Sequence, residues 1–178
     1  MDQEDMAKKL TFITGGARSG KSAFAEKLAS DSSGKRAYLA TAQALDAEMV
    51  ARIEHHRQRR GSVWDTFEEP LAVAELLKIL SGRYGVVLLD CLTLWLSNVM
   101  ARTEKDDFVL TKVDDLMNAL RDFSGVCIVV SNEVGLGIVP DNALARRYRD
   151  LAGIMNQRIA QRADDAYFLA SGIPLKIK

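Results

Sequence analysis

The segment from Gly15 to Ser22 has the residue types and spacing that best fit a chemical site. It reads GGARSGKS and matches the pattern GxxxxGK[ST]. Glycines let a backbone turn its N–H groups towards an anion, and the N-terminus of a helix adds partial positive charge. The lysine of this pattern can reach the β- and γ-phosphates, and the hydroxyl of the final residue can ligate Mg²⁺. The pattern predicts a loop that holds a nucleoside triphosphate, with contacts from Gly15, Gly16, Ala17, Arg18, Ser19, Gly20, Lys21 and Ser22.

The flanking sequence supports this prediction. Residues 10–14 form a short apolar run typical of a buried strand, and residues 21–30 have helical spacing. A strand before the loop and a helix after it are the context that the motif requires. Lys21 is therefore predicted to be catalytic, and Ser22 to be a metal ligand.

Asp90 is the candidate for the second metal ligand. It closes the apolar run Val86–Leu89, and a carboxylate at the C-terminal end of a parallel strand faces the ligand crevice. There it could hold Mg²⁺ directly or through water. The alternative is that Asp90 caps a helix beginning at Leu92. We favour the metal role, because the phosphate loop requires a second acid.

Glu133 follows another apolar strand, residues 126–131, and should open onto the same edge of the sheet. It could position a nucleophile or cap a turn, and the sequence favours neither reading.

The two histidines, His55 and His56, are adjacent in a basic run that continues to Arg60. A solvated helix end explains such a run, because cations are favourable near a helix C-terminus. Chemistry explains it too, because neutral imidazole is a nucleophile and arginines neutralise phosphate oxygens. His56 follows Ile53 by three residues and Met49 by seven, so helical spacing places it on the inward side. His55 falls on the outward side. If one histidine reacts, it should be His56.

Composition excludes several classes of protein. The chain has 24 Lys and Arg against 24 Asp and Glu, which argues against a dedicated nucleic-acid binder. Cys91 and Cys127 lie beside apolar runs, so we expect buried free thiols rather than a metal site or a disulfide framework. The acidic N-terminus is unlike a signal peptide, and the most apolar stretch, residues 86–101, is short and interrupted by a carboxylate. We therefore expect a cytoplasmic protein without a membrane span.

Apolar strands alternate with helices along the chain, which predicts an α/β fold with a mostly parallel sheet covered on both faces. Residues 1–9 are expected to be a flexible lead-in and residues 10–178 a single domain. The expected strands are 10–14, 36–40, 63–67, 86–90 and 126–131, with a C-terminal antiparallel hairpin formed by 166–171 and 175–178. The expected helices are 21–30, 46–60, 70–80, 92–100, 106–123 and one that follows Pro140. Apolar residues recur at helical spacing in the last two of these helices, which predicts a stripe on each: Val109, Val113, Leu116 and Leu120 on the first, and Leu144, Tyr148, Leu151, Met155 and Ile159 on the second.

Several further blocks of sequence are similar to one family. The chain resembles the adenosylcobinamide kinase / adenosylcobinamide-phosphate guanylyltransferase family of cobalamin biosynthesis from Leu10 to Lys178. The resemblance is carried by GGARSGKS at Gly15, YLATAQ at Tyr38, DAEMVARIEHHR at Asp46, WDTFEEP at Trp64, LLDCLTLWLSN at Leu88, SNEVGLGIVP at Ser131 and NQRIAQRADDAYFLASGIPLKIK at Asn156.

The resemblance implies a RecA-like P-loop fold, a trimer and two reactions. In the first, the aminopropanol hydroxyl of adenosylcobinamide is phosphorylated, with ATP or GTP as the donor. In the second, a histidine attacks the α-phosphate of GTP, and the guanylyl group then passes to the cobinamide phosphate to give adenosylcobinamide-GDP. The family's histidine closes the pattern RIxxH, which falls on His56. Beyond the loop, the implied nucleotide contacts are Ala40, Thr41, Ala42, Arg57, Gln58, Arg59, Arg60, Glu68 and Asp90.

Glu68 also suits guanine chemically, because a carboxylate accepts from both the N1–H and N2–H donors of that base. Two rival functions remain open. A P-loop kinase for another small alcohol would use Lys21 and Asp90 but not the histidine–arginine run. A non-catalytic nucleotide-dependent switch would need a partner surface, and the sequence shows no tail, coiled coil or charge block for one.

Overall fold

The computed structural model describes residues 8–43, 47, 50–51, 54 and 63–178 of the chain. Within these residues a seven-stranded sheet forms in the order β3-β2-β4-β5-β1-β6-β7. All neighbouring strands are parallel except the final pair, β6 and β7. The strands are β1 Lys9–Gly15, β2 Arg36–Ala40, β3 Asp65–Glu68, β4 Val86–Asp90, β5 Val126–Val130, β6 Asp165–Ala170 and β7 Ile173–Lys176. The helices are α1 Lys21–Ser30, α3 Val73–Leu80, α4 Leu92–Met100, α5 Asp106–Asp122 and α6 Ala143–Arg162.

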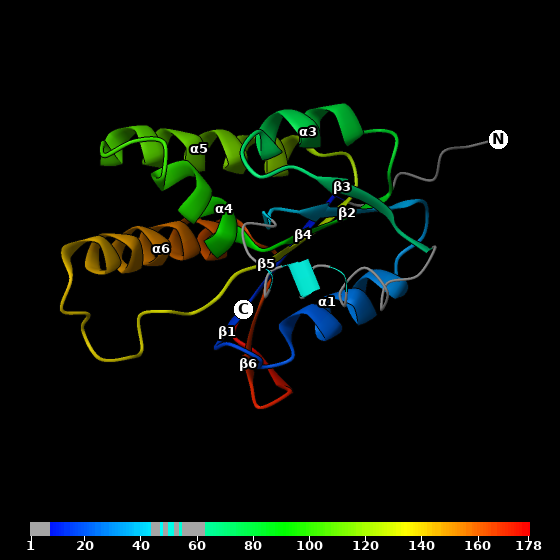
Figure 1. Ribbon diagram of the computed structural model, residues 1–178. Helices are drawn as coiled ribbons and strands as arrows, with labels where there is room; N and C mark the ends of the chain where they lie inside the picture. The colour runs from blue at the N-terminus through cyan, green and yellow to red at the C-terminus, as the bar shows by residue number, and fades with distance from the viewer. Residues whose placement is uncertain (1–7, 44–46, 48–49, 52–53, 55–62) are drawn as a thin grey trace.

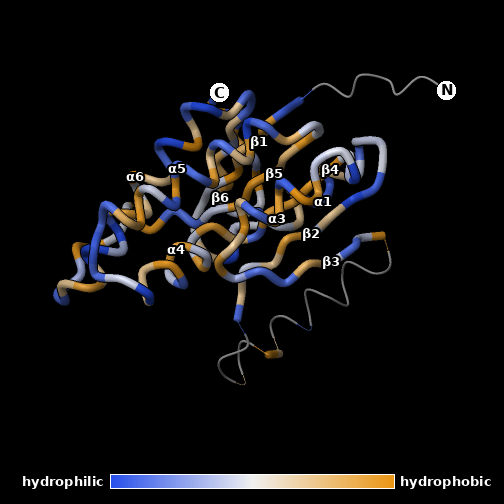
Figure 2. The backbone as a smooth tube through the Cα atoms, turned by 90° about the horizontal axis from the view of Figure 1, so that it is seen from above, coloured by the Kyte–Doolittle hydropathy of each residue, from blue (hydrophilic) through white to orange (hydrophobic). Residues whose placement is uncertain are grey.

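Helices cover both faces of the sheet. Figure 1 shows α3, α4, α5 and α6 on one face and α1 on the other. Alternate side chains of each strand point to opposite faces, so Phe12 and Leu89 join the cluster under α3–α6, whereas Ile13 and Leu88 join the cluster under α1. The central strands are apolar throughout because both of their faces are buried, as the tube coloured by hydropathy in Figure 2 also indicates.

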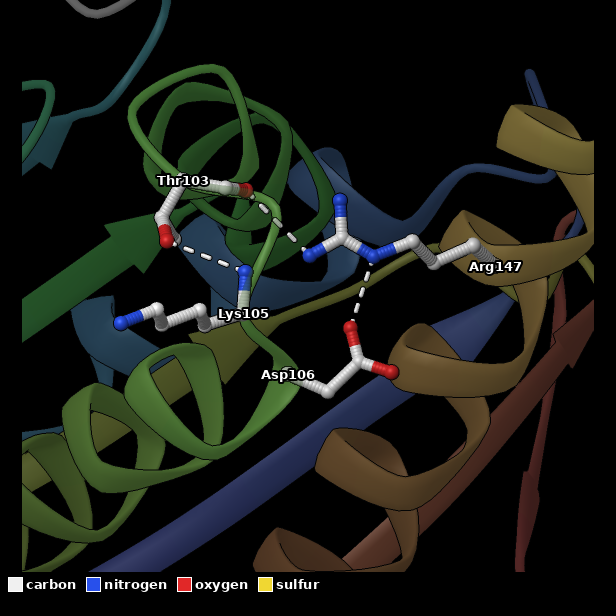
Figure 3. A network of polar contacts seen from close by, with 4 residues as sticks. All are labelled: Thr103, Lys105, Asp106 and Arg147. Atoms are coloured by element: carbon white, nitrogen blue, oxygen red, sulfur yellow. Dashed lines mark hydrogen bonds and ion pairs between the residues drawn. The ribbon is translucent and has the colours of Figure 1, made fainter.

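An ion-pair network fixes α6 against the start of α5. Arg147 of α6 donates from Nε to Asp106 Oδ1 at 2.7 Å and from Nη2 to the carbonyl oxygen of Thr103 at 3.3 Å. Figure 3 shows the guanidinium lying between the two partners, with Thr103 Oγ1 also accepting from the Lys105 backbone. The last turn before α5 is thereby tied to the helix that follows the β5 loop.

Several element boundaries differ from the sequence prediction by one to three residues, and the starts of α3 and β7 show a local cause. Pro70 is not the first residue of a helix, because α3 begins at Val73. Glu69 Oε1 instead accepts from the backbone N–H groups of Leu71 and Ala72, which makes a turn before the helix. The C-terminal hairpin turns at Ser171 and Gly172, both with positive φ, so β7 begins at Ile173 rather than at residue 175. Two positive φ values match a tight hairpin turn, and an edge strand tolerates Pro174.

Side-chain burial confirms most of the predicted helical stripes. Val109, Val113, Leu116 and Leu120 of α5 are all buried. Leu144, which helical spacing placed on the buried side of α6, is 67% exposed, because the helix makes its buried contacts from Leu151 onwards. Both cysteines are buried free thiols, as predicted. No helix in the described part of the chain is long and apolar enough to cross a membrane.

The predicted helix at 46–60 lies almost wholly outside the described residues. Ala47, Val50, Ala51 and Glu54 are described, and all four are helical and exposed. The positions predicted for Met49, Ile53 and both histidines lie outside the described residues.

Candidate functional site

The segment between β1 and α1 forms a compact loop. Gly15 closes β1 where a Cβ atom would stand 2.4 Å from the Leu169 carbonyl oxygen, so a larger residue does not fit. Gly20 precedes α1 with φ 93°, a conformation that favours glycine. The tip of the C-terminal hairpin supports the loop, because the Gly172 backbone donates to the Ser19 carbonyl oxygen at 3.0 Å. The hairpin therefore helps to shape the predicted phosphate loop.

The helix that follows this loop offers its N-terminus to an anion. Gly20 is the N-cap and has no side chain to occupy the first backbone N–H groups, and the first turn of α1 contains no acidic residue. Gly16, Ala17 and Arg18 are exposed at the rim of the loop. Uncapped N–H groups and the helix dipole together favour a phosphate at this position.

Lys21 lies over the loop. Its side chain is buried, and Nζ donates to the Gly16 carbonyl oxygen at 2.6 Å and to Ser19 Oγ at 3.5 Å. A cation fixed at the rim of an anion-binding loop is the arrangement that the motif predicts.

Ser22 and Asp90 meet at the end of the sheet. Ser22 Oγ donates to Asp90 Oδ2 at 2.7 Å, although 68 residues separate them. The hydroxyl of Tyr38 donates to the same oxygen at 2.9 Å. The N-cap of α4 is Cys91 and carries no side-chain cap, so the predicted alternative role of Asp90 as a helix cap has no support in the geometry.

This pair fits a magnesium ion that a nucleotide brings with it. Mg²⁺ prefers oxygen ligands and usually takes one or two protein groups together with substrate phosphates and water. A hydroxyl and a carboxylate in contact beside the phosphate loop supply such groups. Among the described residues no three His, Cys, Asp or Glu side chains gather to hold a metal by themselves.

The register of the sheet places other predicted contacts in a row. Ala40 pairs with Glu68 on one side and with Asp90 on the other, so the ends of β3, β2 and β4 lie side by side. Glu68 is exposed at the outer end of this row. A guanine contact from Glu68 remains a prediction.

Thr41 has a structural role that its sequence position did not reveal. Its side chain is fully buried, and Oγ1 donates to the Cys91 carbonyl oxygen at 2.7 Å and accepts from the Cys91 backbone N–H at 3.0 Å. Its carbonyl oxygen accepts from Asn98 Nδ2 at 2.8 Å. Thr41 therefore joins β2 to the turn after Asp90. Nucleotide contacts from Thr41 and from the half-buried Ala42 remain predictions.

Glu133 makes a turn, which is one of its two predicted roles. Its Oε1 accepts from the backbone N–H of Gly135, and its own N–H donates to the Gly15 carbonyl oxygen at 2.9 Å. The residue thus ties the loop after β5 to the phosphate loop. A role in positioning a nucleophile remains a prediction.

Sequence reasoning missed a polar network behind the site. Asn132 Nδ2 donates to Thr93 Oγ1 at 3.0 Å, and Asn156 Nδ2 donates to the Asn132 carbonyl oxygen at 3.1 Å. Ser131 Oγ donates to Asn156 Oδ1 at 2.6 Å. These bonds join the first turn of α4 and the residues after β5 to α6. The available signal was the presence of polar residues directly after the apolar strand β5.

The surroundings of Cys91 disfavour the thiolate form of its side chain. Burial raises the pKa of its thiol, and the adjacent Asp90 carboxylate raises it further. The thiolate is the reactive form, so the protonated thiol is inert near neutral pH. The other predicted reactive and binding groups, His56 with its neighbour His55 and Arg57, Gln58, Arg59 and Arg60, lie outside the described residues.

A buried lysine over a glycine loop, a hydroxyl–carboxylate pair and a parallel sheet define a P-loop nucleotide-binding protein. Two solved structures share the fold. A KaiC-like protein from Pyrococcus horikoshii OT3 has a TM-score of 0.51 and 13% identity, over 90% of this chain and 70% of that one. A type III secretion system ATPase has a TM-score of 0.57 and 11% identity, over 92% of this chain and 51% of that one.

Sequence comparisons are more specific. The family model described as cobinamide kinase / cobinamide phosphate guanyltransferase matches residues 11–177, and the chain belongs to that family. The bifunctional adenosylcobalamin biosynthesis protein CobP of Pseudomonas aeruginosa is 45% identical, over 93% of this chain and 95% of that protein. The bifunctional adenosylcobalamin biosynthesis protein CobU of Escherichia coli is 41% identical, over 95% of this chain and 99% of that protein. The predicted family, fold class and pair of activities are thus confirmed.

Proposed function

We propose that this protein phosphorylates adenosylcobinamide and then transfers GMP from GTP to the product, with His56 as the site of a guanylyl-enzyme intermediate. The observation that carries the proposal is the contact between Ser22 and Asp90 beside the buried Lys21, found in a chain of this family. The geometry supports nucleotide chemistry, and the family supports the acceptor.

In the kinase step, the aminopropanol hydroxyl of the corrinoid attacks the γ-phosphate of ATP or GTP, and the nucleoside diphosphate leaves. The loop amides and the α1 N-terminus hold the phosphates, and Lys21 stabilises the charge that spreads over the β- and γ-oxygens. Ser22 and Asp90 would hold Mg²⁺, which neutralises phosphate charge when bound. Phosphoryl transfer needs little more from the protein than this positioning.

In the guanylyl step, an imidazole nitrogen of His56 attacks the α-phosphate of GTP, and pyrophosphate leaves. The phosphorylated corrinoid then takes the GMP and frees the histidine, which gives adenosylcobinamide-GDP. The basic run from Arg57 to Arg60 would neutralise phosphate oxygens during the attack. Glu68 would select guanine by accepting from N1–H and N2–H.

The family resemblance also supports a homotrimer. Two buried thiols without a disulfide are compatible with a cytoplasmic location, which we propose as well. Neither proposal enters the reaction scheme.

Labelled GTP tests the proposal and separates it from its rivals. Label in the γ-position should move to cobinamide, and label in the α-position should first appear on the protein and then pass to cobinamide phosphate. A kinase without nucleotidyl transfer would move only the γ-label. A nucleotide-dependent switch would move neither label to a corrinoid, and that result would contradict the proposal.

A further inference from the structure

The hydroxyl of Tyr38 is a buried group at the site to which the reaction scheme assigns no role. Tyr38 is 3% exposed, and its hydroxyl donates to Asp90 Oδ2 at 2.9 Å. Ser22 Oγ donates to that same oxygen at 2.7 Å. Among the described residues, no group donates a hydrogen bond to Asp90 Oδ1. One carboxylate oxygen of Asp90 thus accepts hydrogen bonds from two hydroxyl groups, which lie on α1 and β2.

The sheet register explains why these groups meet. Tyr38 pairs with Leu88, and Ala40 pairs with Asp90. Because every second residue of a strand points to the same face, Tyr38, Leu88 and Asp90 all lie on the face that α1 covers. Ser22 lies in the first turn of α1 and approaches from above that face.

The Tyr38 ring is held independently of its hydroxyl. It belongs to the buried cluster under α1, and it packs edge-on against Trp64 with ring centroids 5.9 Å apart. A buried aromatic ring has few torsional freedoms, so it can deliver its hydroxyl to a fixed point. Removing the oxygen should therefore change the carboxylate's hydrogen bonding while leaving the core contacts of the ring in place.

We propose that Tyr38 is a positioning residue that orients the Asp90 carboxylate, and with it the Ser22 hydroxyl, for the magnesium ion of the bound nucleotide. The proposal rests on the proposed function in one respect, the binding of Mg²⁺–nucleotide at this loop. Two donors on Oδ2 fix the carboxylate plane and leave Oδ1 to accept from a metal-bound water. Ser22 can donate its proton to Asp90 and still offer an oxygen lone pair to the metal. Groups that orient metal ligands typically change metal affinity by about 10- to 100-fold when they are removed.

The test compares Tyr38→Phe with Tyr84→Phe in the full chain. Tyr84 is a matched control, because its hydroxyl also donates to a carboxylate, Asp65 Oδ2 at 2.8 Å, and its ring packs edge-on against Phe67. Calorimetry would measure binding of β,γ-imido-GTP in EDTA and across a Mg²⁺ titration. We expect Tyr38→Phe to bind the metal-free nucleotide like wild type and to raise the Mg²⁺ midpoint about tenfold. Tyr84→Phe should match wild type in both conditions.

A double-mutant cycle with Asp90→Asn shows whether Tyr38 acts through Asp90. In the Asp90→Asn background, Tyr38→Phe should add nothing to the Mg²⁺ midpoint, because the group it orients is already altered. Tyr38→Met fills the buried space without a hydroxyl and should reproduce the effect of Tyr38→Phe. It also serves as the test variant if Tyr38→Phe does not fold.

Three results would overturn the proposal: an unchanged Mg²⁺ midpoint in a folded Tyr38 variant, an equal loss of affinity with and without Mg²⁺, or additive effects in the cycle. Failure of the proposed function would look different, because wild type itself would then show no Mg²⁺-dependent binding of the nucleotide.

Discussion

At the scale of single residues, the site depends on a few groups that the fold brings into contact from distant parts of the chain. Ser22 and Asp90 were predicted as metal ligands from motif and position alone, and the structure places them 2.7 Å apart. Tyr38 could not be assigned from sequence, because its contact with Asp90 depends on the register between β2 and β4. For Thr41 the family resemblance implied a nucleotide contact, and the structure shows that its hydroxyl bonds to the Cys91 backbone.

Lys21→Ala should abolish the kinase reaction. The β- and γ-phosphate oxygens would lose a fixed cation, and the loss of one such contact costs on the order of 10²-fold or more in rate. The measurement is kinase turnover, with the melting temperature as a check of folding. Lys27→Ala is the control, because Lys27 is exposed in the last turn of the same helix. Near-normal turnover in folded Lys21→Ala would contradict the phosphate-loop assignment.

Glu68→Gln should weaken the preference for guanine in the guanylyl step. The amide still accepts one hydrogen bond but introduces donors that face the donors of the base. Labelling of the enzyme by GTP, ITP and ATP would be compared. Glu69→Gln is the neighbouring control, because Glu69 Oε1 accepts from backbone groups before α3. A full advantage for GTP in Glu68→Gln would place the guanine contact elsewhere.

At the scale of elements, apolar runs and turn residues predicted most of the fold. The bounds of α1, β2, β4 and α4 agree with the prediction to the residue. The predicted start of α3 at Pro70 was wrong, because the Glu69 side chain accepts hydrogen bonds from the backbone and the helix begins only at Val73. Helix propensity does not predict such a side-chain hydrogen bond. The predicted burial of Leu144 was wrong. Helical spacing identifies the apolar face of a helix, but it does not show which part of that face other elements cover.

One carboxylate adds side-chain ion pairs to the backbone pairing between the C-terminal hairpin and β1. Asp165 of β6 contacts Lys9 of β1 at 2.6 Å and Lys176 of β7 at 2.5 Å. Hydrogen bonds from Lys176 and Lys9 lower the pKa of Asp165 below its ordinary value of 3.8. Because the tip of this hairpin supports the phosphate loop, the network contributes to the site as well as to the sheet.

Asp165→Asn should lower the melting temperature by a few degrees at pH 7. The folded-state pKa is depressed, so the stabilisation is fully present above the ordinary pKa and is lost as the pH falls through the lowered one. The difference between wild type and variant should therefore shrink from mildly acidic pH downwards. Melting curves between pH 7 and pH 3 would measure it. A difference that stays constant, or that grows as the pH falls, would show that the carboxylate charge is not the cause.

At the scale of the whole molecule, the two reactions of this family need different groups. The described residues supply the phosphate loop and the hydroxyl–carboxylate pair, which are the groups that the proposed kinase step uses. The guanylyl reaction also needs a nucleophile, which the family resemblance assigns to His56. Helical spacing favours the same histidine over His55. Both histidines lie outside the described residues, and covalent labelling distinguishes them.

The most direct test is covalent labelling of His56→Ala and His55→Ala with α-labelled GTP. Alanine offers no atom that can attack phosphorus, so His56→Ala should form no guanylyl-enzyme. It should still phosphorylate adenosylcobinamide, because Lys21 and Ser22 are untouched. His55→Ala should retain both reactions, and the wild-type label should be labile in acid and stable in base, as a phosphoramidate is. If label persists in His56→Ala and disappears in His55→Ala, the nucleophile is His55 and the assignment to His56 is wrong. If label persists in both variants, the intermediate does not form on a histidine.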